Sequence, residues 1–205
     1  MVEQDPDTKT YRLGIHLIEL GNAALSSTSL ARVARPYLEK LWLDTGKSIS
    51  LLLFHGLMRS CILNSSSREI LSVRPAPLEA DTMHATGSGK LALAYLPEKE
   101  LENFLSQARL ARFTSATLTS PEKLLAELER IRQQGYALDD EEHGEGVRCI
   151  AAPIRDASRR VVGCLDLVFP IYNVSDEKMQ EWIRASIECA REMEQKMMAI
   201  GLVVP

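Results

Sequence analysis

The feature that most limits the possible folds is a pair of apolar segments separated by a short polar turn. The segments cover residues 147–154 and 161–169, and residues 156–160, with the sequence DASRR, lie between them. Two apolar segments joined by so short a connection predict a β-hairpin of antiparallel strands. We therefore expect an antiparallel sheet that contains this hairpin.

The rest of the chain shows the apolar spacing of several helices and a few further strands. The expected helices, each with apolar residues three or four positions apart, cover 11–24, 30–41, 87–96, 98–108, 121–134 and 176–200. The expected further strands cover 49–54, 58–63 and 70–73. Gly56 should join the first two of these strands, and Pro36 should kink or restart the second helix. Ser120 and Ser175 should cap the last two helices, with Gly135 ending the first of them. This order predicts an α+β domain in which helices cover an antiparallel sheet.

Composition and charge exclude several kinds of partner. Of the 205 residues, 45% are hydrophobic and 25% are charged, and the net charge is -4 at pH 7. Such a chain is long enough to bury a core, but its acidic balance does not suit tight binding to nucleic acid. The N-terminal residues lack the pattern of a signal peptide, and no apolar run reaches membrane-spanning length. We therefore expect a cytoplasmic protein that makes no contact with a membrane.

An acidic segment before the hairpin brings titratable side chains close to a cysteine. Residues 139–143 read DDEEH, and the glycines of the following GEG turn let Asp139 and His143 fold back over Cys149. The imidazole would then generate a thiolate and the carboxylate would orient the imidazole, as in a nucleophilic enzyme. The same three side chains are acceptable zinc ligands, although the usual ligand spacing is missing. An inert cysteine packed in an apolar strand is the third interpretation.

The four cysteines show neither a CxxC motif nor regular spacing. We therefore expect free thiols instead of a disulfide framework or a structural zinc site. These residues are Cys61, Cys149, Cys164 and Cys189.

The segment MHATGSGK at 83–90 resembles a phosphate-binding loop only superficially. The P-loop motif requires glycine where His84 stands and serine or threonine where Leu91 stands. The remaining signal is a turn at 86–89 that opens a helix, where free backbone N–H groups suit an anion or a carbonyl oxygen. Alternatively, Thr86 simply caps the helix and the glycines allow close packing.

Asp166 stands inside an otherwise apolar strand. Strand alternation places Cys164, Asp166 and Val168 on one face, opposite Leu165 and Leu167. A buried carboxylate is costly unless it is paired. We expect either an ion pair with an arginine of a neighbouring element or a hydrogen bond to a ligand.

Four segments taken together resemble the effector-binding domain of IclR-family transcriptional regulators. They occur in order over nearly the whole chain, and the last is long and specific. The segments are YRLG at 11–14, ARPYLEKL at 34–41, MHATGSGK at 83–90 and GYALDDEEHGEGVRCIAAPIRD at 135–156. Members of this family are similar in having a GAF-like domain that binds a small metabolite and thereby tunes an N-terminal winged helix-turn-helix.

The resemblance implies a domain organisation and a set of partners. It places a linker helix region at 1–24 and a GAF-like effector-binding domain, an antiparallel sheet flanked by helices, at 25–205. The winged helix-turn-helix is absent from this chain, so we expect either an expressed fragment, which we favour, or an orphan effector domain. DNA would be contacted only through the missing domain. The expected partners are a metabolite effector and further copies of the chain, as a homodimer or as a dimer of dimers (homotetramer). No cofactor, metal or catalytic residue is implied.

The resemblance also assigns candidate effector contacts. Positions that correspond to ligand contacts in similar proteins are Gly87, Ser88, Asp139, Cys149, Ile70, Val73 and Val147. The backbone N–H groups of the first two would meet an oxygen of the ligand, and the last three would form apolar walls. Asp166 and Val168 join this site, where similar sequences tend to have small residues such as serine. Several acids around one cavity would repel a carboxylate, so we expect an effector rich in hydroxyls or carrying an amine, and not a simple keto acid such as pyruvate.

Two other functions remain open at this point. A thiol-based GAF-like enzyme would use Cys149, with Cys164 as its redox partner across the hairpin. A purely structural oligomerisation module would leave the pocket empty.

Overall fold

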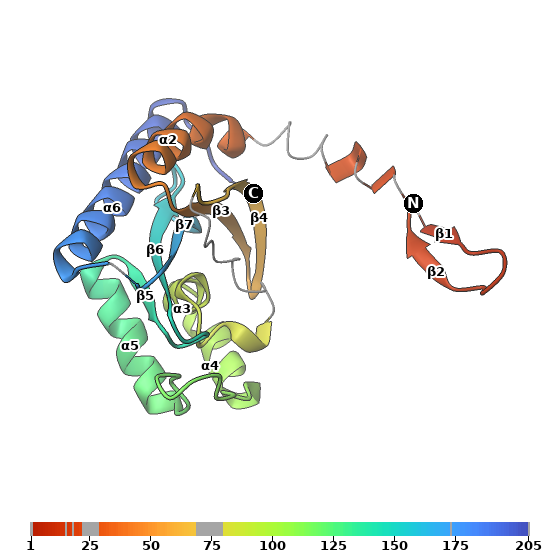
Figure 1. Ribbon diagram of the computed structural model, residues 1–205, viewed down its shortest axis with the longest axis horizontal. Helices are drawn as coiled ribbons and strands as arrows, with labels where there is room; N and C mark the ends of the chain where they lie inside the picture. The colour runs from red at the N-terminus through yellow and green to blue at the C-terminus, as the bar shows by residue number, and fades with distance from the viewer. Residues whose placement is uncertain are drawn as a thin grey trace.

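Five antiparallel strands form the central sheet, in the order β4-β3-β7-β6-β5 (Figure 1). The structure is a computed structural model that describes residues 2–14, 16–17, 19–21, 29–68, 80–172 and 174–204. The strands of this sheet are β3 (Ser48–His55), β4 (Met58–Ser65), β5 (Ala137–Asp140), β6 (Val147–Arg155) and β7 (Val161–Pro170). The predicted α+β fold with an antiparallel sheet flanked by helices is confirmed.

The predicted hairpin is formed by β6 and β7, at the centre of the sheet and next to its edge strand β5. In this hairpin Cys149 pairs with Val168, and Ala151 pairs with Asp166. The sequence predicts no strand before the GEG turn, yet β5 pairs with β6 and places Asp139 opposite Cys149. A strand of four residues, two of them aspartates, is too short to show a clear apolar alternation.

The helices cover the two faces of the sheet in separate groups (Figure 1). One face carries α2 (Ser29–Thr45) and α6 (Asp176–Ala199). The other face carries α3 (Gly87–Ala94), α4 (Glu98–Gln107) and α5 (Pro121–Gln134). Leu165 and Leu167 of β7 belong to the core with α2 and α6, whereas Cys164 belongs to the core with α3 and α5. The predicted alternation along β7 is therefore confirmed.

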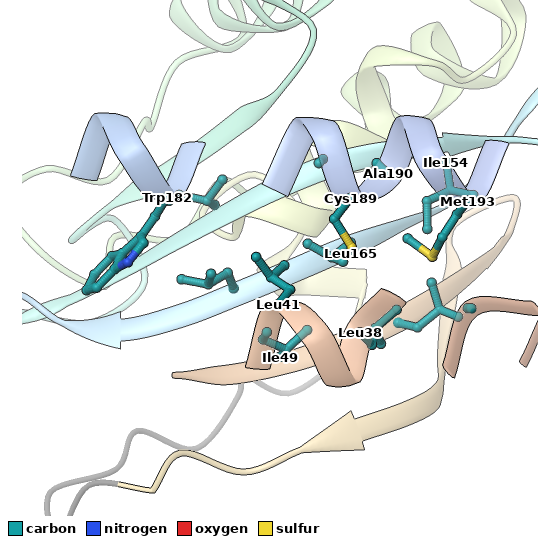
Figure 2. Packing of buried hydrophobic residues seen from close by; sticks show 14 of the residues in the cluster. Leu38, Leu41, Ile49, Ile154, Leu165, Trp182, Cys189, Ala190 and Met193 are labelled. Atoms are coloured by element: carbon teal, nitrogen blue, oxygen red, sulfur yellow. The ribbon is translucent and has the colours of Figure 1, made fainter. Parts of the chain in front are cut away.

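The core between the sheet and the pair α2 and α6 is built from apolar side chains (Figure 2). Leu41 of α2, Met193 of α6 and Leu165 of β7 are all almost completely buried there. Phe169 contacts Trp182 edge to face, with the ring centroids 4.8 Å apart. Burial of such apolar area is the main favourable contribution to folding, and it fixes the sheet against these two helices.

The ends of the helices follow the expected capping. Ser120 accepts a hydrogen bond from the backbone N–H of Lys123, and Gly135 ends α5 in the left-handed conformation with φ of 80°. Of the two outcomes predicted at Pro36, a kink or a restart of the second helix, the restart does not occur, because α2 continues through Pro36. Pro36 is exposed, so water can satisfy the carbonyl group that its missing N–H leaves unpaired. Among the described helices, none is both long and apolar enough to cross a membrane.

The N-terminal residues differ from the prediction. The helix predicted over 11–24 is wrong at its first residues, which form strand β2 (Tyr11–Leu13). This strand pairs antiparallel with β1 (Val2–Gln4). Asp5 closes this hairpin by accepting the backbone N–H groups of Asp7 and Thr8 at 2.9 Å and 2.8 Å. Local turn chemistry of this kind competes with helical periodicity. Helical conformation is present at residues 16–17 and 19–21.

One predicted strand cannot be placed. The strand expected at 70–73, with the candidate wall residues Ile70 and Val73, lies outside the described residues.

Candidate functional site

The N-terminus of α3 lies directly against strand β6. Thr86 caps α3, and its hydroxyl accepts the backbone N–H of Gly89 at 3.2 Å. A side chain at Gly87 would place its Cβ 3.2 Å from the carbonyl oxygen and 3.3 Å from the sulfur of Cys149. Glycine therefore allows the first turn of α3 to approach the thiol closely.

The described candidate contacts converge on the same side of the sheet. Asp139, Cys149 and Val168 are opposite one another on β5, β6 and β7, and Asp166 stands two residues before Val168. Alternation places these side chains on the face that carries α3. We call this group the α3 cluster, and its members are Gly87, Ser88, Asp139, Val147, Cys149, Asp166 and Val168.

The polar members of the α3 cluster are buried but not sealed. Asp139 is 5% exposed and Asp166 is 7% exposed, whereas Cys164, on the same face of β7, is 0% exposed. Both carboxyl groups are therefore almost completely buried, although slightly less so than the thiol of Cys164.

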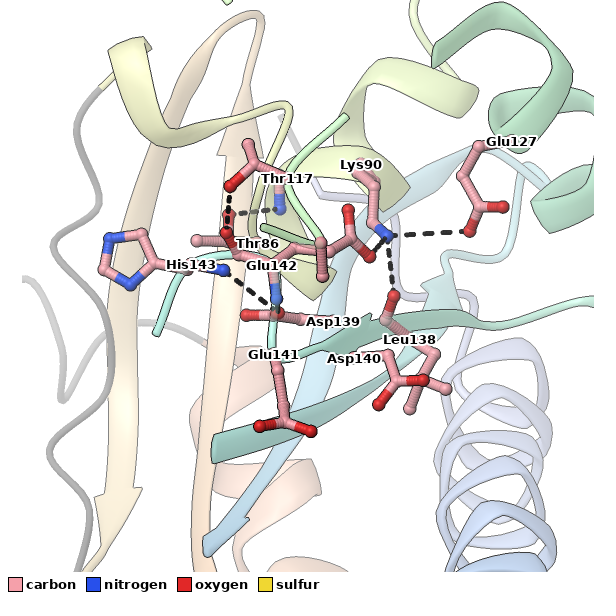
Figure 3. Close-up of polar contacts among 12 residues, drawn as sticks. Thr86, Lys90, Thr117, Glu127, Leu138, Asp139, Asp140, Glu141, Glu142 and His143 are labelled. Carbon is pink, nitrogen blue, oxygen red and sulfur yellow. Dashed lines mark hydrogen bonds and ion pairs between the residues drawn. The ribbon is translucent and has the colours of Figure 1, made fainter. Parts of the chain in front are cut away.

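The carboxyl group of Asp139 is held by its own loop (Figure 3). Its Oδ1 accepts the backbone N–H groups of Glu142 and His143 at 2.8 Å and 3.3 Å. Burial raises the pKa of Asp139 to about 7, with a further increase from the charge of Glu142, while the hydrogen bonds and Lys90 oppose the shift. Asp139 is therefore close to half protonated at neutral pH.

Lys90 is the buried charge that anchors the acidic loop to α3. Its side chain is 0% exposed, and its Nζ donates to the carbonyl oxygen of Leu138 at 2.6 Å and to the carboxylate of Glu142. Glu127 of α5 forms a second ion pair with Nζ at 3.6 Å (Figure 3). Burial raises the pKa of Glu142, and Lys90 opposes this shift. The ion pair thereby joins α3, α5 and the loop after β5.

Two threonines support the acidic loop from the segment before α5. Thr117 donates its hydroxyl to the carbonyl oxygen of Glu142 at 2.6 Å, and Thr114 donates to that of Glu141 at 2.7 Å. These bonds satisfy buried loop carbonyls that would otherwise be costly. The acidic segment is therefore a bonded loop and not a solvated acidic face.

His143 is directed toward an aromatic ring. Its imidazole contacts the ring of Phe113 in a tilted arrangement, with the centroids 5.1 Å apart, and the ring of His84 lies 5.7 Å from Phe113, also tilted. Burial, followed by the charge of Arg59, lowers the pKa of His143. Among the described residues, no hydrogen bond joins His143 to Cys149. The arrangement needed for a Cys-His-Asp nucleophile is not formed.

The thiols are in the wrong state and place for catalysis. Burial, followed by the charge of Asp166, raises the pKa of both Cys149 and Cys164, so both stay protonated. Cys149 pairs with Val168 and Cys164 with Pro153, which separates the two by four residues along the strands, about 13 Å. A disulfide requires Cα atoms within about 7 Å. The predicted redox pair is therefore wrong, and the described residues hold no cluster of metal-binding side chains.

Asp166 lies in a network that the sequence motifs did not reveal. The thiol of Cys164 donates to its Oδ1 at 3.3 Å. Burial raises the pKa of Asp166 to about 6, and the thiol of Cys164, the hydroxyl of Ser88 and the charge of Arg59 oppose the shift. The described contacts include no direct ion pair between Arg59 and Asp166. The expected ion pair between Asp166 and an arginine is therefore not formed among the described residues, and the alternative, a hydrogen bond to a ligand, stays a prediction.

Arg59 is a buried residue next to the α3 cluster that the sequence motifs do not include. It stands in β4, 5% exposed, and donates from Nη1 to Thr86 at 2.9 Å and to Ser88 at 3.1 Å. Its Nη2 donates to Thr82 at 3.1 Å. A charged residue inside an expected strand was the available signal, the same one that identified Asp166.

Most of the chain is similar in sequence and structure to known proteins. Residues 22–195 match the family model described as bacterial transcriptional regulator IclR, C-terminal. HTH-type transcriptional regulator BhcR of Paracoccus denitrificans is 34% identical over 193 residues, 94% of this chain and 69% of that protein. Transcriptional repressor IclR of Escherichia coli is 31% identical over 194 residues, 94% of this chain and 71% of that protein. The crystal structure of Thermotoga maritima IclR matches with a TM-score of 0.78 at 30% identity, over 96% of this chain and 79% of that chain.

Proposed function

The chain belongs to the IclR C-terminal family of bacterial transcriptional regulators, and we propose that the α3 cluster is where it binds its effector. The domain is the effector-binding domain of a transcriptional regulator, and a thiol-based enzyme is not supported. The observation that carries the proposal is the convergence of two buried carboxyl groups, Asp139 and Asp166, on the first turn of α3.

The first turn of α3 supplies hydrogen-bond donors to the ligand. The leading N–H groups of a helix have no partner within the helix, and they form the positive end of its dipole. In α3 these groups belong to Gly87 and Ser88, which lie beside Cys149. An oxygen of the effector binds there, while Val147 and Val168 contact its carbon atoms. Ile70 and Val73 are further proposed wall positions.

The two carboxyl groups define the chemical class of the effector. At neutral pH Asp166 is mostly ionised, because its pKa is about 6, and Asp139, with a pKa of about 7, is near half protonation. Carboxylates accept hydrogen bonds and repel other carboxylates. The effector is therefore rich in hydroxyl groups or carries an amine, and simple keto acids are poor ligands.

Calorimetric titration tests this effector class. The probes are 1-amino-1-deoxysorbitol, sorbitol and pyruvate, added to the wild-type chain and to Asp166→Ser. The amine and the polyol should bind the wild-type chain more tightly than pyruvate, and Asp166→Ser should reduce that difference. Tight pyruvate binding that survives Asp166→Ser contradicts the proposed class.

The regulatory role extends the proposal beyond this chain. Effector binding changes DNA binding by a winged helix-turn-helix, in a cytoplasmic homodimer or dimer of dimers. Residues 1–24 link the two parts, and residues 25–205 form the effector-binding domain. Light scattering with and without a bound probe measures the assembly, and limited proteolysis checks the boundary near residue 24.

The proposal excludes two other roles. Rapid alkylation of Cys149 under native conditions would support an enzyme, whereas a protonated wall thiol reacts slowly. A structural module with an empty pocket would show no thermal shift with any metabolite, whereas an effector raises the melting temperature by binding the native state.

A further inference from the structure

A buried arginine is bonded to the start of α3 and has no role in the function proposed so far. Arg59 stands in β4, which is an edge strand of the sheet. Its Nη1 donates to the hydroxyls of Thr86 at 2.9 Å and Ser88 at 3.1 Å, and its Nη2 donates to that of Thr82 at 3.1 Å. Thr82 ends η1 (Ala80–Thr82), Thr86 caps α3 and Ser88 is the second residue of α3. One side chain thus bonds three points of the turn that leads into the helix.

This turn is tight and bonded within itself. Thr86 Oγ1 donates to the carbonyl oxygen of Thr82 at 3.2 Å and accepts the backbone N–H of Gly89 at 3.2 Å. A Cβ at Gly89 would overlap the carbonyl oxygen of Met83, so the close approach of these two residues requires glycine. The turn and the first residues of α3 therefore form one unit, and the guanidinium of Arg59 fixes this unit to β4.

Two backbone donors of this unit have no acceptor within the described part of the chain. The N–H of Gly89 bonds to the hydroxyl of Thr86, and the N–H of Lys90 bonds to the carbonyl oxygen of Thr86 at 2.9 Å. For the N–H groups of Gly87 and Ser88 the described residues supply no acceptor, although both residues are buried. Buried N–H groups without a partner are rare and costly. Their direction therefore decides how well they can bind an oxygen of a ligand.

The stability of α3 does not explain why an arginine occupies this position. The N-terminus of a helix is the positive end of its dipole, so a cation there is unfavourable, and burying a charge costs further free energy. A glutamine side chain has two donor hydrogens on a single nitrogen, and a lysine has three donors on a single nitrogen. A guanidinium carries five donors in a rigid planar fork, which can hold three hydroxyls in one relative position. Arg59 thus supplies a geometry that the other polar side chains lack.

We propose that Arg59 is a positioning residue of the effector site, which fixes the first turn of α3 so that the N–H groups of Gly87 and Ser88 are directed at one oxygen of the effector. The inference rests on the proposed effector site and adds the residue that orients its donors. Arg59 acts through the hydroxyls of the turn and does not itself contact the effector. Because the donors are already ordered, binding costs less conformational entropy.

Nitrogen-15 relaxation NMR of the full chain without ligand tests the first half of the inference. In the wild type, the order parameters of the Gly87 and Ser88 amides should match those of rigid backbone, about 0.85. In Arg59→Gln, which cannot bond three hydroxyls at once, they should fall below about 0.6. Unchanged order parameters at both amides overturn the proposal.

Three further variants separate the geometry of the fork from its charge and from a general loss of packing. Arg59→Lys keeps the cation but not the planar fork, so the order parameters of the two amides should fall as in Arg59→Gln. Thr82→Val removes one bond of the fork and should cause a smaller fall, which can be measured even if the Arg59 variants do not fold. Arg155→Gln removes an arginine that bonds Tyr95, the C-cap of the same helix, at 3.3 Å, and should leave both amides unchanged.

The results that contradict the proposed role differ from one variant to the next. They are full retention of order in Arg59→Lys, no fall in Thr82→Val, and a fall in Arg155→Gln as large as that in Arg59→Gln.

Calorimetry with sorbitol tests the second half. Arg59→Gln and Arg59→Lys should each weaken sorbitol binding about tenfold, the loss expected when one or two hydrogen bonds to an oxygen are misaligned. Arg155→Gln should bind sorbitol as the wild type does. Unweakened binding in the Arg59 variants overturns the role in effector binding, because a residue that only stabilises the fold would give that result. If sorbitol does not bind the wild type, the effector class proposed above is wrong, and the order parameters still decide the role of Arg59.

Discussion

The two faces of the sheet are stabilised in different ways. On the face toward α2 and α6, the buried side chains of β7 are Leu165, Leu167 and Phe169, and they contact other apolar groups. On the face toward α3, the same strand contributes Cys164 and Asp166. This side also has an apolar core, but buried charges and hydroxyls lie beside it. One strand therefore serves a dry core on one side and a polar site on the other.

This difference separates stability from recognition. Apolar packing is insensitive to pH and carries no directional information, whereas buried polar groups are costly unless each is bonded. The α3 face keeps its charges buried through defined partners, such as Lys90 for Glu142 and the hydroxyl of Ser88 for Arg59. We expect changes on the first face to alter stability alone, and changes on the second to alter both stability and ligand preference.

The largest effect is expected on the apolar face. Phe169→Ala should lower the free energy of unfolding by about 3–5 kcal/mol, because it leaves a cavity beside Trp182. Urea denaturation measures this loss, with Leu125→Ala as a control at a site that is 42% exposed. Ligand preference of the folded Phe169→Ala protein should be unchanged. A changed preference would show that the two faces are not independent.

The next largest effect is expected at the buried ion pair of the α3 face. Lys90→Met should lower the free energy of unfolding by about 3 kcal/mol, since it leaves Glu142 buried without its cation. Adding Glu142→Gln should restore part of this loss. A double-mutant cycle from urea denaturation gives the coupling, and zero coupling would contradict a role for the pair.

The sequence predicted the apolar face well because its signals are local and periodic. Alternation along 161–169 placed Leu165 and Asp166 on opposite faces, and the caps at Ser120 and Ser175 fixed the starts of two helices. These features depend on residues adjacent in the chain, so a single sequence contains them.

The polar face could be predicted only in part, because its contacts join residues that are distant in the chain. The positions of Asp139 and Cys149 followed from the family resemblance, and the structure brings them together. The partner of Lys90 is 52 residues away, and that of Arg59 is 29 residues away at Ser88. Apolar periodicity cannot predict such pairs. The sequence indicates them only by a charged residue inside an otherwise apolar segment.

The third largest effect is a pH dependence of stability, which we expect to arise on the α3 face alone. The pKa of Asp139 is about 7 in the folded protein, above its value of about 4 in an unfolded chain, so the folded state binds the extra proton in between. Stability should therefore fall as the pH rises from 4 to 7. Asp139→Asn keeps the acceptor for the N–H groups of Glu142 and His143 but removes the titration. Between pH 5 and pH 7 the wild type should lose about 2 kcal/mol more than this variant, as measured by urea denaturation at each pH.

A free energy of unfolding that rises between pH 5 and pH 7, relative to Asp139→Asn, would contradict the assigned environment of Asp139. Phe169→Ala is the comparison from the other face. It should lower the free energy of unfolding by the same amount at every pH.

The smallest effect is expected where the acidic loop meets the segment before α5. Thr117→Val removes the hydroxyl that donates to the carbonyl oxygen of Glu142 and should cost about 1 kcal/mol. The carbonyl keeps only its longer 3.3 Å bond from Thr114, and the backbone N–H groups of Phe113 and Thr114 lose their acceptor. Hydrogen exchange should become faster at the amides of Glu142 and His143, whose acceptor is Asp139, and stay unchanged in α6. Thr119→Val is the matched control, because that hydroxyl accepts from Arg112 at the surface and does not contact the loop. Faster exchange in α6 as well would mean that the loop and the apolar face open together, and the separation of the two faces would then be incorrect.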